Sequence, residues 1–154
     1  CHDLGAARTG SAIPLAEVGT DRHRLDMWTP AAAAAYNAYG EGHAWKFSRF
    51  RTTLGYVAAP LDGVWLNGPY LHNGSVPTLS DLLEPPQNRP AKFWRGFDLF
   101  DDQRVGFVSS GAEAERVGTL LDTSQPGNSN VGHTYGTALT ADEKRALLEY
   151  LKTL

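Results

Sequence analysis

The chain begins with a cysteine that is directly followed by a histidine, Cys1 and His2. Cys-His is the second half of the Cys-x-x-Cys-His motif, in which thiols bond covalently to a haem and the adjacent imidazole ligates its iron. The first cysteine of that motif would then precede Cys1. A haem would constrain the fold strongly, because this large apolar group supplies burial that helices and sheets otherwise provide.

The composition is that of one globular domain, which we expect to span residues 1–154. A hydrophobic content of 42% with 20% charged residues is ordinary for a chain of 154 residues, and such a chain can bury a core by itself. The net charge of −3, without a block of Lys or Arg, argues against a nucleic-acid partner. A single cysteine excludes an internal disulfide framework and a zinc ribbon. No apolar run approaches the roughly 20 residues of a transmembrane helix, so we expect no transmembrane segment.

Local signals predict three helices, and the first two are short. Thr29 can cap a helix whose first position is Pro30 and whose alanine-rich run ends at Gly40. A second helix is predicted over residues 78–83. Thr78 or Pro77 would open it, and Pro85 and Pro86 would prevent it from continuing.

The third predicted helix follows Thr140, which forms a capping box with Glu143. Its apolar side chains recur on one face, at Leu147, Tyr150, Leu151 and Leu154. We expect mostly irregular structure over residues 89–131, with a short strand at 105–108. The predicted fold is therefore mostly α, with a few short helices and long loops around one haem.

So much loop in a compact domain normally counts against an assignment, but a central haem changes that expectation. An aromatic set would surround the group, although each member is equally expected in an ordinary core. Its members are Trp28, Trp45, Trp65, Trp94, Phe47, Phe50, Tyr56 and Tyr70.

His133 is the candidate for the second iron ligand. In c-type cytochromes this ligand usually comes from a loop shortly before the C-terminal helix. His133 lies seven residues before Thr140, and Gly132 and Gly136 allow the backbone to approach a ring closely. The alternative is a solvated loop imidazole.

Met27 is the rival ligand, because thioether ligation is common in electron carriers. It precedes the first predicted helix, an early place for this ligand, and we expect it to pack under the haem or in the core. His23 lies among charged residues, and His43 follows two glycines, so both are expected on the surface.

Residues 60–79 carry the most specific motif, a Pro-Tyr-Leu-His-Asn-Gly run from Pro69 to Gly74 with Thr78 and Leu79 after it. This segment resembles the C-terminal haem domain of bacterial di-haem cytochrome c peroxidases and their relatives. The rubber oxygenase-like branch is the most similar, by the run from Pro85 to Phe107 and by a Gly-His-x-Tyr-Gly-Thr loop. The resemblance covers nearly the entire chain and implies a cytochrome c-like domain, truncated inside its haem-attachment motif.

The resemblance also implies roles for particular residues. His2 would be the proximal iron ligand, and Cys1 would form one thioether. His133 takes the position that carries a methionine ligand in typical peroxidases, so ligation by two histidines is implied. His72 matches a loop histidine beside the haem that is usually not an iron ligand; it would order the loop or hydrogen-bond near a propionate.

Four further residues are candidates for contacting the haem. Arg49 and Arg51 would pair with the propionates, because a guanidinium matches a carboxylate, although unpaired surface charge is an equal alternative. Trp65 and Tyr70 come from the aromatic set and lie in or beside the conspicuous motif.

Two imidazole ligands would saturate the iron and favour electron transfer over peroxide or oxygen binding. The expected partners are redox proteins or a neighbouring haem domain, and covalent attachment of this kind implies a periplasmic or extracellular location in a bacterium. One alternative is a peroxidase or oxygenase with an open iron site. Another is a haem-free interaction domain in which Cys1 and the histidines are incidental.

Overall fold

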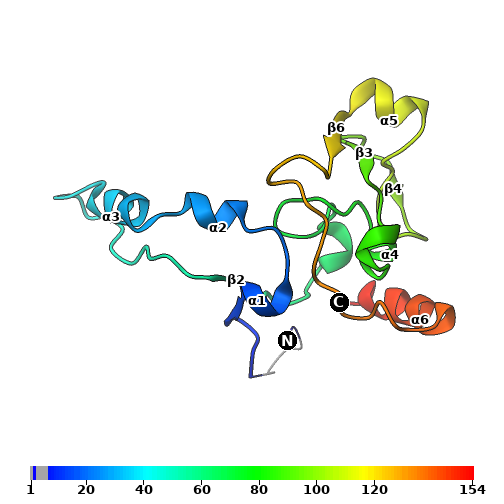
Figure 1. The fold of residues 1–154 in the computed structure, drawn as a ribbon, viewed down its shortest axis with the longest axis horizontal. Helices are drawn as coiled ribbons and strands as arrows, with labels where there is room; N and C mark the ends of the chain where they lie inside the picture. Colours follow the sequence, from blue (N-terminus) through cyan, green and yellow to red (C-terminus); the bar gives the residue numbers. More distant parts are fainter. Residues whose placement is uncertain (1, 3–6) are drawn as a thin grey trace.

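A body of short helices and two-stranded sheets carries a projecting arm in the computed structural model, which describes residue 2 and residues 7–154 (Figure 1). The arm comprises residues 22–54 and includes helices α2 (His23–Met27) and α3 (Pro30–Ala38). Cys1, the predicted thioether residue, lies outside the described residues.

An antiparallel strand pair joins the arm to the body. Strand β1 (Ala12–Pro14) pairs with β2 (Gly55–Val57), and helix α1 (Leu15–Val18) follows β1 directly. Helix α1 ends at Gly19, which takes a left-handed conformation with φ of 67°. The chain therefore leaves for the arm and returns from it at one place.

The arm buries almost none of its apolar surface on the body. Of its residues, all of which the structure describes, Ala33 alone is buried. The rings of Trp28, Tyr36 and Phe50 pack on one another with centroids 5.0–5.6 Å apart. Met27 is 74% exposed, so the prediction that it packs in the core is wrong.

Helix α3 confirms the first predicted helix, because Thr29 caps it by accepting a hydrogen bond from the Ala32 amide at 3.1 Å. Helix α4 (Leu79–Leu82) confirms the second, and the Thr78 hydroxyl accepts from the Asp81 amide at 3.0 Å.

Most of residues 89–131 lie outside helices and strands, as predicted, but the segment also contains paired strands and a helix that were not predicted from the sequence. Strand β3 (Lys92–Arg95) pairs antiparallel with β6 (Thr119–Asp122), and the two-residue strands β4 (Phe100–Asp101) and β5 (Gly106–Phe107) pair with each other. Helix α5 (Ala112–Val117) precedes β6. Only β5 lies where a strand was expected.

The expected mostly α class is wrong. The chain has 30% helix and 14% strand, in short helices and small sheets. The reason is visible in β3 and β6, where Phe93 and Leu121 are register partners and are 4% and 2% exposed. Each strand has only four residues, too few to show a clear alternation of apolar and polar positions in the sequence.

Helix α6 (Ala141–Leu151) confirms the third predicted helix, including the capping box between Thr140 and Glu143. Its buried residues are Leu148 and Leu151, whereas Tyr150, assigned to the apolar face, is 57% exposed.

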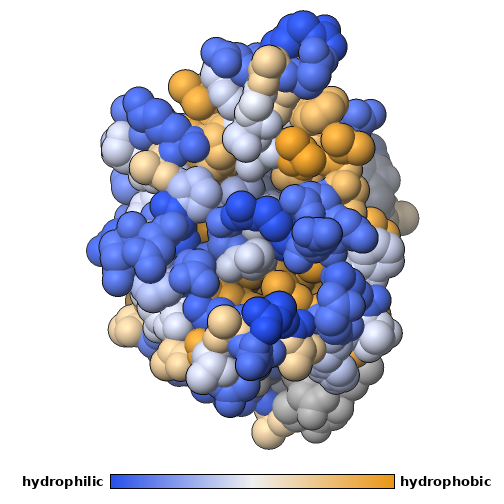
Figure 2. Space-filling model, turned by 90° about the vertical axis from the view of Figure 1, so that its right-hand side faces the viewer, coloured by the Kyte–Doolittle hydropathy of each residue, from blue (hydrophilic) through white to orange (hydrophobic). Residues whose placement is uncertain are grey.

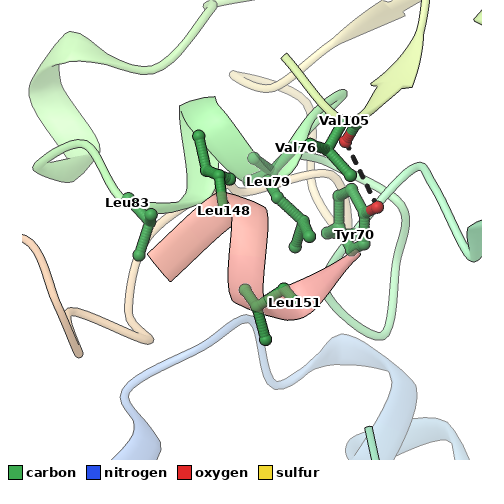
Figure 3. Packing of buried hydrophobic residues seen from close by; sticks show 7 residues of the cluster. All are labelled: Tyr70, Val76, Leu79, Leu83, Val105, Leu148 and Leu151. Carbon is green, nitrogen blue, oxygen red and sulfur yellow. Dashed lines mark hydrogen bonds between the residues drawn. The ribbon is translucent and has the colours of Figure 1, made fainter. Parts of the chain in front are cut away.

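The main core lies where α6 crosses α4, and Tyr70 and Val105 close its far end (Figure 3). Two single 3₁₀ turns, Val64–Leu66 and Pro86–Asn88, flank α4 in sequence. The cluster consists of Tyr70, Val76, Leu79, Leu83, Val105, Leu148 and Leu151.

The surface of the body is mixed in character. On the face in Figure 2, hydrophobic side chains show in hollows between hydrophilic ones. Within the described ranges, none of the helices has the length and apolar character that a membrane span requires.

Candidate functional site

A cavity of about 530 Å³ lies between the β1–β2 pair, α4, α6 and the loop that precedes α6. This volume is typical of sites for small molecules and cofactors. Most of the lining is apolar, and it includes Ile13, Val18, Leu71, Leu79, Leu83 and Leu147. A few polar side chains reach the cavity, among them His2, His72 and His133.

His2 and His133, the two predicted iron ligands, meet in this cavity although they are far apart in sequence. Their ring centroids are 6.3 Å apart, and the ring planes are inclined by 45°. Two imidazoles that bind one metal ion from opposite sides, each through a bond of about 2 Å, have centroids roughly 6 Å apart. The spacing therefore suits one metal ion between the rings.

The ring of His2 is oriented by the backbone. Its Nδ1 lies 2.7 Å from the carbonyl oxygen of Ala59, so Nδ1 carries the proton and donates it. The neutral ring then keeps its free electron pair on Nε2. A carbonyl acceptor on the second nitrogen is the usual way in which a protein fixes the tautomer of a metal-binding histidine.

The loop that carries His133 is pressed against the end of α1. The His133 amide donates to the Val18 carbonyl at 2.8 Å, and His133 itself has a positive φ of 46°. Any side chain on Gly132 would collide with the backbone of Gly19. Only glycine therefore permits this approach of the two segments.

The imidazole of His133 is half-buried. Burial lowers its pKa, because the charged form would lose its hydration. Its Nδ1 has no hydrogen-bond partner. An unpaired polar atom in a buried position is uncommon and calls for an explanation, such as a bound group.

His72 lines the same cavity, and its ring stacks on Tyr56. Its Nε2 is also buried without a partner, as is Oγ1 of Thr20, another lining residue. Burial lowers the pKa of His72, because the charged form of the ring would lose its hydration. These atoms give the apolar cavity a few unsatisfied polar groups.

The residues present fit a haem. The lining offers apolar contact for a macrocycle, an imidazole pair at the spacing of two axial ligands, and unpaired polar atoms. The described residues contain no group of three or more His, Cys, Asp or Glu that could hold a bare metal ion. A haem needs no such group, because its own ring supplies the other ligands.

The other predicted contact residues are divided between the cavity and the surface. Tyr70 lines the cavity, and its hydroxyl lies 3.1 Å from the Val64 carbonyl, while burial raises the pKa of the phenol. Trp65 is not among the lining residues and instead packs edge-on against Phe100. Of the wider aromatic set, Tyr56 is the other member that lines the cavity.

Arg49 and Arg51 lie on the exposed part of the arm that returns from α3 to β2. Neither lines the cavity, so this arrangement does not bring them to the predicted propionates. Their pairing with propionates stays a prediction. His43 is exposed and stacks on Trp45, and His23 lies beside Asp21 on the surface.

Sequence reasoning missed Arg89, which is only 4% exposed. Its guanidinium donates hydrogen bonds to backbone carbonyls of the loop that carries His133, including those of Gly132 and His133 itself. A single arginine between Asn88 and Pro90 gives no signal of burial, because arginine is usually a surface residue.

Comparison with known proteins gives one family and two relatives. Residues 55–95 match the model of a family described as RoxA-like, cytochrome c-like. The chain is 38% identical to "Uncharacterized protein y4iJ" of Sinorhizobium fredii (strain NBRC 101917 / NGR234) in an alignment 154 residues long, which covers 94% of this chain and 25% of that protein. It is 39% identical to "Uncharacterized protein y4iM" of the same organism over 118 residues, 64% of this chain and 27% of that protein.

The chain thus spans about a quarter of the length of these curated relatives. The family match covers the strand β2, the conspicuous Pro-Tyr-Leu-His-Asn-Gly motif, α4 and β3. This region supplies much of the cavity wall, including Tyr56, Leu71 and His72. Residues 55–95 of this chain are therefore similar to a RoxA-like, cytochrome c-like domain, a likeness that indicates haem-based electron transfer.

Proposed function

We propose that this chain is an electron-transfer domain that holds one c-type haem between the imidazoles of His2 and His133. The observation that carries the proposal is the pair of rings in one apolar cavity, with centroids 6.3 Å apart. The cytochrome c-like family match supports it independently, because the matched residues do not include either histidine.

A haem with two imidazole ligands supplies one-electron transfer, because its iron has no free position for peroxide or oxygen. The protein would hold both ligands in the neutral form that binds metal. The Ala59 carbonyl keeps the proton of His2 on Nδ1, and burial disfavours protonation of His133. The leucine and valine lining keeps water away from the pair.

Covalent attachment is part of the proposal. Cys1 directly precedes His2, as the second cysteine does in a Cys-x-x-Cys-His motif. A thioether at Cys1 would tether the haem next to its proximal ligand. The location that we propose is periplasmic or extracellular, since this attachment takes place outside the cytoplasmic membrane.

The redox partner would be a neighbouring haem domain or a separate redox protein. The relatives are about four times as long as the stretch that aligns with this chain. In them this domain is one part of a larger protein, which leaves room for a second haem domain. We propose that the domain passes electrons within such a di-haem peroxidase-like or oxygenase-like assembly.

The test is the optical and electron paramagnetic resonance spectrum of the protein, produced in a bacterium that attaches haem to exported proteins. We expect a low-spin ferric signal typical of two imidazole ligands, no binding of cyanide on mixing, and an intact mass that includes the haem. His133→Ala should become high-spin and bind cyanide. His43→Ala is the matched control, because His43 is exposed on the arm, and its spectrum should not change.

Two results would contradict the proposal. A high-spin ferric signal in the unmodified protein would indicate an open iron site and favour the peroxidase or oxygenase alternative. A protein that folds and contains no haem would favour the interaction-domain alternative.

A further inference from the structure

We propose that Arg89 is a positioning residue that holds the His133 loop in place, so that the imidazole stays in reach of the iron. This inference rests on the proposed function. It assigns a role to a side chain that is not among those lining the candidate haem cavity. The argument depends on where the guanidinium donates its hydrogens and on what else holds the ring of His133.

The guanidinium of Arg89 has five N–H groups, and each of them donates a hydrogen bond to a backbone carbonyl. Nη1 donates to the carbonyls of Asn130 and Gly132 at 2.6 and 2.9 Å, and Nη2 donates to that of His133 at 3.1 Å. The remaining hydrogens go to the carbonyls of Leu82 and Glu84 at 3.2 and 3.0 Å.

The acceptors belong to two separate segments. Asn130, Gly132 and His133 form the ligand loop, and Leu82 and Glu84 stand at the end of α4. Arg89 therefore ties the loop to the helix that forms part of the core. Because a guanidinium is planar and rigid, its donors fix both the distance and the direction of the acceptors.

Among the described residues this side chain forms no ion pair. Burial lowers the pKa of Arg89, and the charge of Asp81 only partly offsets this effect. A buried charge that pairs only with carbonyls is costly unless each hydrogen bond is made. The complete set of acceptors explains how the charge is tolerated, and it makes the loop geometry a condition of burying Arg89.

The imidazole of His133 is held by an edge-on contact with the ring of Tyr135, at a centroid distance of 5.1 Å, and otherwise by its own backbone. Its Nδ1 has no hydrogen-bond partner, whereas the Nδ1 of His2 is anchored on a carbonyl. The ring position is therefore set by the loop, whose His133 residue has the positive φ of 46°. A strained conformation of this kind persists only where its surroundings enforce it.

A second hydrogen bond joins the His133 loop to the segment that carries Arg89. The Asn130 amide Nδ2 donates to the carbonyl of Pro90 at 3.1 Å, next to Arg89 in sequence. Asn130 is also buried, at 9% exposure. Removing this bond should loosen the loop in the same direction as changing Arg89, but less.

The main test is Arg89→Lys in the haem-loaded protein. Lysine keeps the positive charge but has fewer donors on a flexible stem, so it cannot span both segments in the same way. We expect a mixture of low-spin and high-spin iron, and cyanide binding about tenfold faster than in the unmodified protein or more. Added imidazole should restore the low-spin spectrum, because it replaces a ligand that has moved away.

Arg104→Lys is the matched control. Arg104 pairs with Asp81 on α4, yet it is half exposed and does not contact the His133 loop. Its spectrum and cyanide rate should equal those of the unmodified protein. Asn130→Ala should show a smaller increase in the cyanide rate, and it decides the question if Arg89→Lys does not fold.

A purely structural role for Arg89 would lower stability without changing the spin state or the cyanide rate. That result, in Arg89→Lys or in Asn130→Ala alone, overturns the inference. Failure of the proposed function looks different: the unmodified protein would then lack haem or would itself bind cyanide at once.

Discussion

The imidazole of His72 stacks on the phenol ring of Tyr56, with ring centroids 3.9 Å apart and 17° between the ring planes. The two residues come from the motif segment and from β2, and both line the candidate haem cavity. The stack fixes His72 at the wall of the cavity. His72 therefore differs from His2 and His133, whose rings lie close to each other in the cavity.

His72→Gln is expected to leave both axial ligands in place. His72 is held by its stack on Tyr56, and the resemblance to di-haem peroxidases assigns it no iron bond. The variant should keep a low-spin ferric spectrum, in contrast to His133→Ala. Electron paramagnetic resonance of the two proteins, measured side by side, checks this. A high-spin signal from His72→Gln would make His72 a ligand.

Tyr56→Phe should keep the stack and lose one hydrogen bond, which the Tyr56 hydroxyl donates to the Asp21 carbonyl at 2.9 Å. The expected cost is about 1 kcal/mol in the free energy of unfolding, measured with urea. Tyr56→Ala removes the ring as well and should cost about 3 kcal/mol or more. Equal losses in the two variants would show that the stack contributes nothing.

Leu121→Ala should destabilise the fold by about 2–5 kcal/mol, because this side chain is 2% exposed and faces Phe93 across the β3–β6 pair. Leu120→Ala is the control in the same strand. Leu120 is 45% exposed, and its replacement should change the free energy of unfolding by about 0.5 kcal/mol or less. The reverse order would mean that the register of β6 is shifted by one residue.

Acid should remove a contribution to stability made by Asp122. Hydrogen bonds from Ser124, together with Lys92, lower the pKa of Asp122 to about 2 from its usual 3.8. A depressed pKa stabilises the folded state above the unfolded value, and this contribution is lost as pH falls from 3.8 towards 2. Asp122→Asn should therefore be less stable than the unmodified protein at pH 6.

The difference between these two proteins should shrink at pH 2, because the carboxyl of Asp122 is then protonated in the unfolded chain and about half protonated in the folded one. Urea unfolding at the two pH values measures it. A difference that does not change with pH would assign the effect to the shape of the turn rather than to the charge.

The helices could be predicted because their signals are local. Thr29 with Pro30, and Thr140 with Glu143, occupy neighbouring positions whose hydrogen bonds form within one helical turn. The β3–β6 pair could not, because Phe93 and Leu121 are brought together only by the folded chain between them. Strands of four residues leave a pattern too short to separate from chance.

The candidate site divides in the same way. The Cys-His pair led to His2, and the glycine-flanked loop before the last helix led to His133; the structure brings their rings into one cavity. Arg49 and Arg51 were chosen for their chemistry alone, and their place on the arm could not be read from residue type. Arg89 was missed because its partners are backbone carbonyls, which leave no trace in the sequence.

The Tyr56 hydroxyl and the Asp21 carbonyl clamp the two ends of the arm together, directly beside the cavity wall. Because both ends of the arm are held at this hydrogen bond, the arm can become longer or shorter at a small entropic cost. Each doubling of the length of a flexible loop adds only about 0.6 kcal/mol to the free energy of closing it. Variation among related proteins can therefore accumulate in residues 22–54 while the pocket keeps its shape.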